Sequence, residues 1–131
     1  MKTVKLTQEF PVSPHILYAA WLNSKTHSEM TGGEAHCSDA EGEKFTAWDG
    51  YIEGTNISLN LPKEIIQKWR TADFKDSDPD STIKIEFEET PNGCLMTLTH
   101  SEIPEGQPDY HQGWIDNYLE PMKDHFRRSG L

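Results

Sequence analysis

The longest regular pattern of apolar positions lies near the end of the chain, between Pro108 and Arg128. Its apolar side chains recur at steps of three and four residues: Tyr110, Trp114, Ile115, Tyr118, Leu119, Met122 and Phe126. This spacing places them on one face of an α-helix, opposite the charged residues. The pattern predicts one long helix with a broad aromatic face. Pro121 lies inside it and is expected to bend the helix, either to follow a curved sheet, which we favour, or as a hinge beside a cavity.

The beginning of the chain predicts a strand and two short helices. Apolar residues alternate up to Phe10, as in a strand. Ser13 followed by a proline is a strong helix start, because the hydroxyl accepts an unpaired backbone N–H and proline has none to satisfy. This helix is expected to end near Leu22. Ser24 is the predicted cap of a second short helix, which ends at the glycine pair beginning with Gly32.

In the middle of the chain the apolar positions recur every second residue, which is the period of a β-strand. Strands are predicted around residues 45–49, 57–61, 66–70, 83–87 and 94–103. A turn is expected at Asp49-Gly50, and the polar segment from Asp73 to Ser81 is expected to be a loop. The element order predicts a single α+β domain over residues 1–131, in which a curved antiparallel sheet of about six to seven strands wraps around the C-terminal helix.

Charge and composition exclude several partners. The chain has 22 acidic and 12 basic residues and a net charge of −10, which repels phosphate backbones and anionic lipids. We therefore expect no nucleic-acid partner and no membrane partner. The first residues lack the apolar core of a secretory signal, so a cytoplasmic location is expected. Cys37 and Cys94 have no CxxC spacing and are expected to be small buried residues rather than a disulfide.

The sequence predicts no metal site, no cofactor and no catalytic residue. Its six histidines include no HxxxH or HxH pair. Asp76, Asp78 and Asp80 have the spacing of a calcium loop, but Ser81 and Phe87 stand where that loop requires glycine and glutamate. No nucleophile elbow, phosphate-binding glycine loop or dinucleotide fingerprint is present. The chain offers no positive evidence for an enzyme.

The aromatic residues have two interpretations. Ordinary core packing accounts for most of them, but a sheet wrapped around one helix can also leave a cavity for an apolar ligand. His100 shares a strand face with Met96 and Leu98, and is either a satisfied core residue or a group that orients a polar part of a ligand. We expect any cavity to be lined by Trp21, Phe45, Trp69, Phe87, His100, Trp114, Tyr118 and Met122.

Several short motifs follow one another in a specific order and spacing. They are the capped Ser13-Pro14 helix reaching Trp21, Gly42–Phe45 with Trp48–Gly50 and Gly54, Ile66–Arg70, Ile103-Pro104, and Gly113-Trp114 with Tyr118–Lys123. Taken together, they resemble the activators of the heat-shock-protein-90 ATPase, in particular their C-terminal domain and its bacterial homologues. The resemblance covers nearly the whole chain.

This resemblance implies the helix-grip fold shared with lipid-transfer START domains and the plant pollen-allergen (Bet v 1-like) family. Many members of that superfamily bind hydrophobic ligands between sheet and helix. The resemblance also implies a heat-shock-protein-90-type chaperone as partner. The eukaryotic activators make their main chaperone contact through a separate N-terminal domain, to which no segment of this sequence corresponds.

Three functional hypotheses follow. The first is a non-enzymatic domain that assists a chaperone, binds a small hydrophobic ligand in its cavity, or does both. The alternative is a cyclase- or hydrolase-like enzyme that uses His100 or a cavity tyrosine as general acid or base. In the third, the acidic surface meets a basic protein partner.

Overall fold

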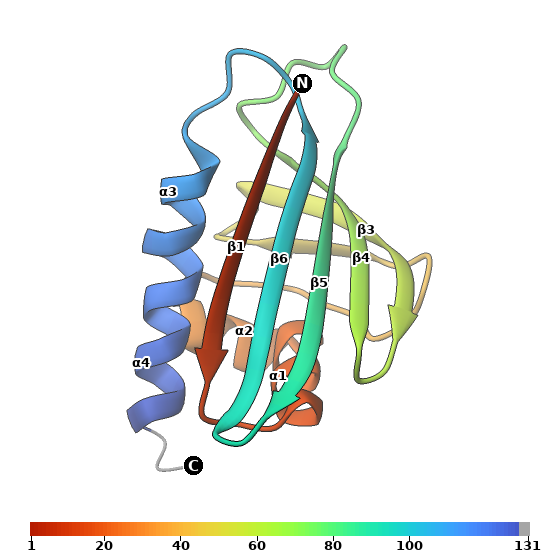
Figure 1. The fold of residues 1–131 in the computed structure, drawn as a ribbon. Helices are drawn as coiled ribbons and strands as arrows, with labels where there is room; N and C mark the ends of the chain where they lie inside the picture. The colour runs from red at the N-terminus through yellow and green to blue at the C-terminus, as the bar shows by residue number, and fades with distance from the viewer. Residues whose placement is uncertain (129–131) are drawn as a thin grey trace.

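The sheet curves around the C-terminal helix, which packs along its inner face (Figure 1). The computed structural model describes residues 1–128. The strands are β1 (Lys2–Phe10), β2 (Lys44–Ala47), β3 (Ile52–Asn60), β4 (Glu64–Thr71), β5 (Ser81–Thr90) and β6 (Gly93–Ile103). All pairs are antiparallel, and the order across the sheet is β1-β6-β5-β4-β3-β2. The predicted α+β helix-grip fold is confirmed.

Two short helices, α1 (Pro14–Leu22) and α2 (Ser24–Thr31), lie in the connection between β1 and β2, the two edges of the sheet. The Ser13 hydroxyl caps α1 by accepting the Ile16 N–H at 3.3 Å. The cap of α2 is Asn23 and not the predicted Ser24, because the Asn23 side chain accepts the Thr26 N–H at 3.0 Å. Both helices stand where the sequence predicts them.

The long C-terminal helix changes its hydrogen-bond pattern once. It consists of α3 (Tyr110–Trp114), a π-helical turn η1 (Ile115–Leu119) and α4 (Glu120–Arg128). The Glu120 N–H donates to the carbonyl of Ile115, five residues back. Pro121 lacks the N–H that an α-helix needs at this point, and the wider turn directly precedes it. The structure thus shows a π-helical turn directly before Pro121.

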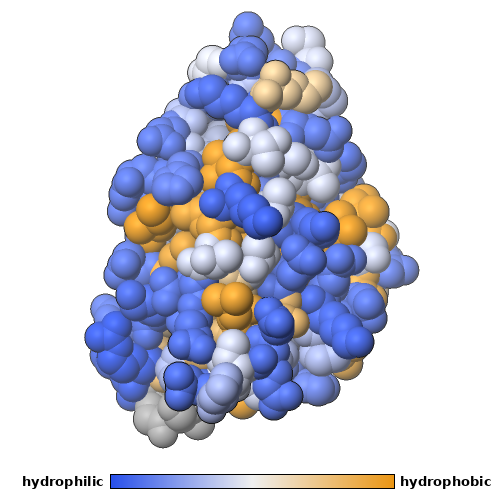
Figure 2. Space-filling model, viewed as in Figure 1, coloured by the Kyte–Doolittle hydropathy of each residue, from blue (hydrophilic) through white to orange (hydrophobic). Residues whose placement is uncertain are grey.

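The core lies between the helices and the inner face of the sheet. Along β4, along β5 as far as Phe87 and along β6 as far as His100, every second side chain is buried, as the period of two predicts. The C-terminal helix covers this face, and the rings of Phe126 and Phe10 meet edge to face with centroids 6.1 Å apart. Figure 2 shows that the outer face is largely hydrophilic, with apolar groups gathered in the seam between α3 and β1.

Strand β3 differs from its prediction. It begins at Ile52, earlier than expected, and a bulge follows Asn56. The predicted apolar residues Ile57 and Leu61 are 47% and 61% exposed, whereas Ile52 and Asn56 are 5% and 1% exposed. The polar side chain of Asn56 can be buried because its amide donates hydrogen bonds to the carbonyls of Ser38 and Ala40, at 2.9 and 3.1 Å.

We expect the substitution Trp114→Ala to lower the free energy of unfolding by about 3–5 kcal/mol, because it truncates a large aromatic side chain in the core. Trp114 is 3% exposed and lies where helix and sheet meet. Urea denaturation measures the effect, with Ile16→Ala, at a 43% exposed position of α1, as the control. A loss below about 1 kcal/mol would contradict the packing described here.

Candidate functional site

An open pocket of about 270 Å³ lies between the C-terminal helix and the β3–β4 side of the sheet. The helix contributes residues at steps of three and four, and the opposite wall comes from the β2–β3 turn, β3 and β4. The lining residues are Trp48, Tyr51, Ile52, Trp69, Tyr110, Gly113, Trp114, Asn117 and Tyr118. Because most of them are aromatic, we call this site the aromatic pocket.

Trp114 and His100 connect the helix to the sheet behind the pocket. The Trp114 indole N–H donates to Nδ1 of His100 at 3.1 Å. The proton of His100 is therefore on Nε2, which donates to the Ser81 hydroxyl at 2.8 Å, and that hydroxyl donates to the Trp69 carbonyl at 2.6 Å. Burial lowers the pKa of His100 to about 3, so the ring is neutral. Both ring nitrogens are occupied by these bonds.

A second buried histidine holds the hydroxyl of Tyr118. Nδ1 of His27 donates to the Trp21 carbonyl at 2.8 Å, so Nε2 is the acceptor for the Tyr118 hydroxyl at 3.0 Å. Burial lowers the pKa of His27 and raises the pKa of Tyr118. Because its hydroxyl is held by His27, Tyr118 contributes its ring carbons to the pocket.

The hydroxyl groups of two more lining tyrosines are also held by hydrogen bonds. The Tyr110 hydroxyl donates to Oε1 of Gln107 at 2.8 Å and accepts from the Thr71 hydroxyl at 3.0 Å. Burial raises the pKa of Tyr110 to about 12. Tyr51 donates its hydroxyl to the carboxylate of Asp73. These contacts join the β2–β3 turn, β4 and the loop before α3.

Trp48 belongs to a turn with an unusual backbone. Trp48, Asp49 and Gly50 all have left-handed conformations, with φ of 50°, 59° and 90°. The first two are costly for residues with a side chain and persist where surrounding contacts impose them. The Trp48 ring lies directly on Gly33, where a Cβ atom would come within 2.5 Å of the indole. The Trp48 indole nitrogen is buried and has no hydrogen-bond partner.

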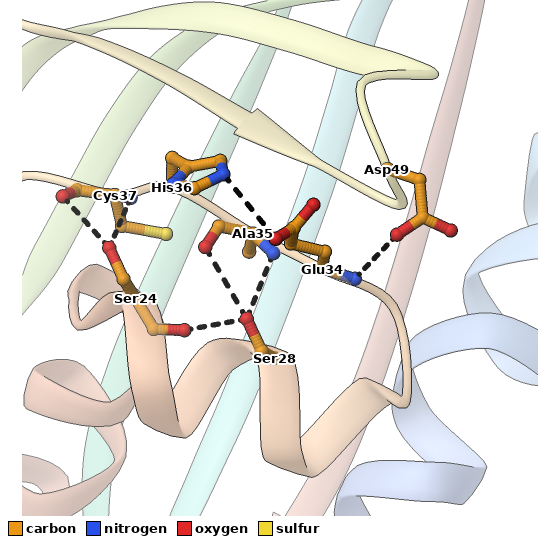
Figure 3. Close-up of polar contacts among 7 residues, drawn as sticks. All are labelled: Ser24, Ser28, Glu34, Ala35, His36, Cys37 and Asp49. Carbon is orange, nitrogen blue, oxygen red and sulfur yellow. Dashed lines mark hydrogen bonds and ion pairs between the residues drawn. The ribbon is translucent and has the colours of Figure 1, made fainter.

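The contacts that impose this turn come from the segment after α2 (Figure 3). The Glu34 N–H donates to Oδ1 of Asp49 at 3.0 Å, and the Asp49 N–H donates to the Glu34 carbonyl at 3.0 Å. Ser28 in α2 accepts the Ala35 N–H at 2.8 Å, which fixes the segment to the helix. The position of Trp48 in the pocket wall is thus set by α2.

Gly113 leaves part of the helix surface open. It lies in α3 with an ordinary helical φ, and a Cβ atom added there would meet nothing within 4 Å. The neighbouring positions Tyr110 and Trp114 carry large rings, so the missing side chain widens the space between them. A larger residue at Gly113 would therefore enter the pocket without displacing the helix.

The structure brings three of the residues nominated from the sequence to this pocket: Trp69, Trp114 and Tyr118. The other five are buried but do not line it. Trp21 packs behind Tyr118 with ring centroids 5.1 Å apart, and Phe87 packs against Tyr18 at 5.6 Å. His100 lies behind Trp114, and the remaining two, Phe45 and Met122, are core residues of β2 and α4.

Six lining residues were not nominated: Trp48, Tyr51, Ile52, Tyr110, Gly113 and Asn117. The helical ones could have been found, because Tyr110, Gly113 and Asn117 continue the spacing of Trp114 and Tyr118. Tyr51 follows a turn, where neither a helical nor a strand period indicates the direction of a side chain.

Residues 1–128 contain no group of three or more histidine, cysteine or acidic side chains placed to hold a metal ion. Within the same residues, no helix is long and apolar enough to cross a bilayer. Cys37 and Cys94 are both free thiols.

A family model described as "Activator of Hsp90 ATPase homolog 1-like protein" matches residues 11–127. The chain belongs to this family. An activator of 90 kDa heat shock protein ATPase homolog from Dictyostelium discoideum is 30% identical over 130 residues, a match that spans 98% of this chain. The same match spans 34% of that relative, so this chain has about a third of its length.

Two solved structures share the fold. A crystal structure of an HSP90 activator from Plasmodium falciparum superimposes with a TM-score of 0.85 at 26% identity, covering 95% of this chain and 96% of that one. A protein from Mesorhizobium loti gives a TM-score of 0.83 at 18% identity, covering 99% and 100% of the two chains.

The buried His100 makes stability depend on pH. Its pKa of about 3 in the folded protein lies below the value of 6.5 in the unfolded chain. As the pH falls below 6.5, the unfolded chain takes up the proton first. The free energy of unfolding should therefore fall by up to about 1.4 kcal/mol per pH unit from this group, until the pH reaches about 3.

Urea denaturation at several pH values between about 7 and 5 tests this expectation. The variant His100→Gln should show a flatter slope than the wild type, and His15→Gln, which removes an exposed imidazole, is the matched control. Equal slopes for the wild type and His100→Gln would contradict the assignment.

Proposed function

We propose that this chain is a non-enzymatic accessory domain of a heat-shock-protein-90-type chaperone. The observation that carries the proposal is the likeness to the Plasmodium falciparum HSP90 activator, which covers nearly all of both chains. The named relative from Dictyostelium supports it over almost the whole length of this chain. The free thiols of Cys37 and Cys94 are consistent with a cytoplasmic location, where cysteines stay reduced.

The state of the buried titratable groups favours a non-enzymatic role over the cyclase- or hydrolase-like alternative. A general acid or base must reach its substrate through a free nitrogen or oxygen. His100 uses one ring nitrogen for Trp114 and the other for Ser81, and Tyr118 donates its hydroxyl to His27. A substrate in the pocket would have to break one of these bonds before proton transfer.

The net charge of −10 supports contact with a basic region of the chaperone. Attraction between exposed charges is screened by salt, so an interface of this kind weakens as the ionic strength rises.

We expect the purified protein to raise the ATP hydrolysis rate of a heat-shock-protein-90-type chaperone from the same organism. The stimulation should decrease as salt is added, because complementary charges drive the association. A coupled ATPase assay measures it, and the chain denatured by heat is the control. No stimulation and no salt-sensitive binding would overturn the chaperone proposal.

A second candidate function is the binding of a small hydrophobic ligand. The observation that favours it is the aromatic pocket, which has about 270 Å³ of space in a wall of tryptophan and tyrosine rings. Pockets of this kind bury most of the surface of a small molecule. The two functions are compatible, because the pocket occupies one side of the domain.

We expect native mass spectrometry of freshly purified protein to detect a retained small molecule, which should be absent from the variant Gly113→Leu. The leucine side chain would fill the pocket. It should also stabilise the fold by about 0.5–1 kcal/mol, since glycine is unfavourable inside a helix. Loss of ligand with retained stability separates pocket filling from unfolding. A bare mass for the wild type would count against a retained ligand.

A further inference from the structure

The aromatic pocket presents mainly ring carbons, with the Asn117 amide as a polar group in its lining. Trp114 donates its N–H to His100, Tyr118 its hydroxyl to His27, and Tyr110 its hydroxyl to Gln107. The Trp48 nitrogen is buried, so it adds no accessible donor to the surface of the pocket. A ligand in this space therefore meets mainly the faces and edges of aromatic rings, together with Ile52 and Asn117.

The rings surround the space from both walls. Trp114 on the helix contacts Tyr118 of the same helix and Trp69 of β4, with ring centroids 4.9 and 5.4 Å from its own. Trp48 and Tyr51 belong to the opposite wall. The face of an aromatic ring carries negative charge density, so several rings around one space attract a cation.

The segments that bear these rings also carry carboxylates, one of which bonds directly to a lining residue. Asp73 accepts the hydroxyl of Tyr51, and Asp49 stands beside Trp48 in the β2–β3 turn. Asp109 precedes the helical part of the lining and Asp116 lies within it, and both side chains accept hydrogen bonds from Gln112. None of the three stretches 48–53, 71–74 and 109–118 contains lysine or arginine.

The two basic residues that flank Trp69 in β4 are turned away from the pocket and paired. Lys68 and Arg70 precede and follow Trp69 in β4, and neighbouring strand residues point to opposite faces of a sheet. Arg70 binds the carboxylate of Asp80 at 2.8 Å, and Lys68 lies 3.7 Å from the carboxylate of Glu102. Neither residue is therefore paired with the carboxylate of Asp73, which bonds to Tyr51.

We propose that the aromatic pocket binds an organic cation, namely a quaternary or protonated ammonium group attached to an apolar body. This inference builds on the proposed ligand-binding function of the pocket and specifies the class of ligand. The apolar body gains from leaving water, and the cationic group gains from the ring faces. The net charge of −10 and the carboxylate of Asp73 beside Tyr51 raise the local concentration of cations and repel anions.

Two probes of nearly the same shape test the proposal. Benzyltrimethylammonium carries the positive charge, and neopentylbenzene has carbon in place of its nitrogen. Binding is followed by tryptophan fluorescence, because Trp48, Trp69 and Trp114 all line the pocket. We expect the cation to bind at least about tenfold more tightly than the neutral probe at low salt.

Three variants identify the site. Gly113→Leu should abolish binding of the cation by filling the pocket. Asp73→Asn keeps an oxygen that can accept the Tyr51 hydroxyl but removes the negative charge. It should therefore weaken binding of the cation several-fold and leave binding of the neutral probe unchanged. Glu89→Gln is the matched control, since it removes a carboxylate at the β5–β6 hairpin, at the end of the sheet far from α3 (Figure 1).

The outcomes separate this inference from the broader ligand-binding proposal. If the neutral probe binds as tightly as the cation and Gly113→Leu abolishes both, the pocket binds ligands and the preference for cations is wrong. If the cation binds equally well to Gly113→Leu, its site is elsewhere and the inference is overturned. If neither probe binds, the inference is also overturned, and native mass spectrometry then decides whether the pocket holds another ligand.

Discussion

The buried indole of Trp114 sets the relation between helix and sheet. An indole N–H inside a core needs an acceptor, and here the acceptor is a ring nitrogen of His100. That bond fixes the tautomer of the histidine, whose other nitrogen holds Ser81 and, through it, the carbonyl of Trp69. A shift of the helix along the sheet would break this chain and leave polar groups unpaired in the core. Apolar packing alone would tolerate several positions, whereas the hydrogen bonds select one.

Most of the fold could be predicted from the sequence because its signals are local. The three- and four-residue steps around Trp114 and the Ser13 cap each depend on a few neighbouring residues. The inner face of β3 could not be predicted in this way. A bulge reverses the expected direction of Ile57, and the buried Asn56 is stabilised by carbonyl groups from a distant segment. Neither feature has a signature in the strand itself.

The candidate site was predictable only where it follows a helix or strand period. Trp69 follows the two-residue period of its strand and Trp114 the three- and four-residue steps of its helix, but Phe87 also follows a strand period and packs in the core. Periodicity reports which side chains turn inward and not which of them border an empty space. The space itself depends on absent atoms at Gly113 and on the left-handed turn at Trp48, which is held by contacts from α2.

The π-helical turn divides the long helix into two parts with different structural roles. Up to and including the turn, α3 and η1 border the pocket; after it, α4 buries Met122 and Phe126 in the core. An α-helix rotates by about 100° per residue, so the extra residue of a π turn offsets the faces of the two parts. Substitutions in α3 can therefore reshape the pocket while α4 continues to anchor the sheet. A chain with such a helix can therefore change what its pocket binds without a change in its fold.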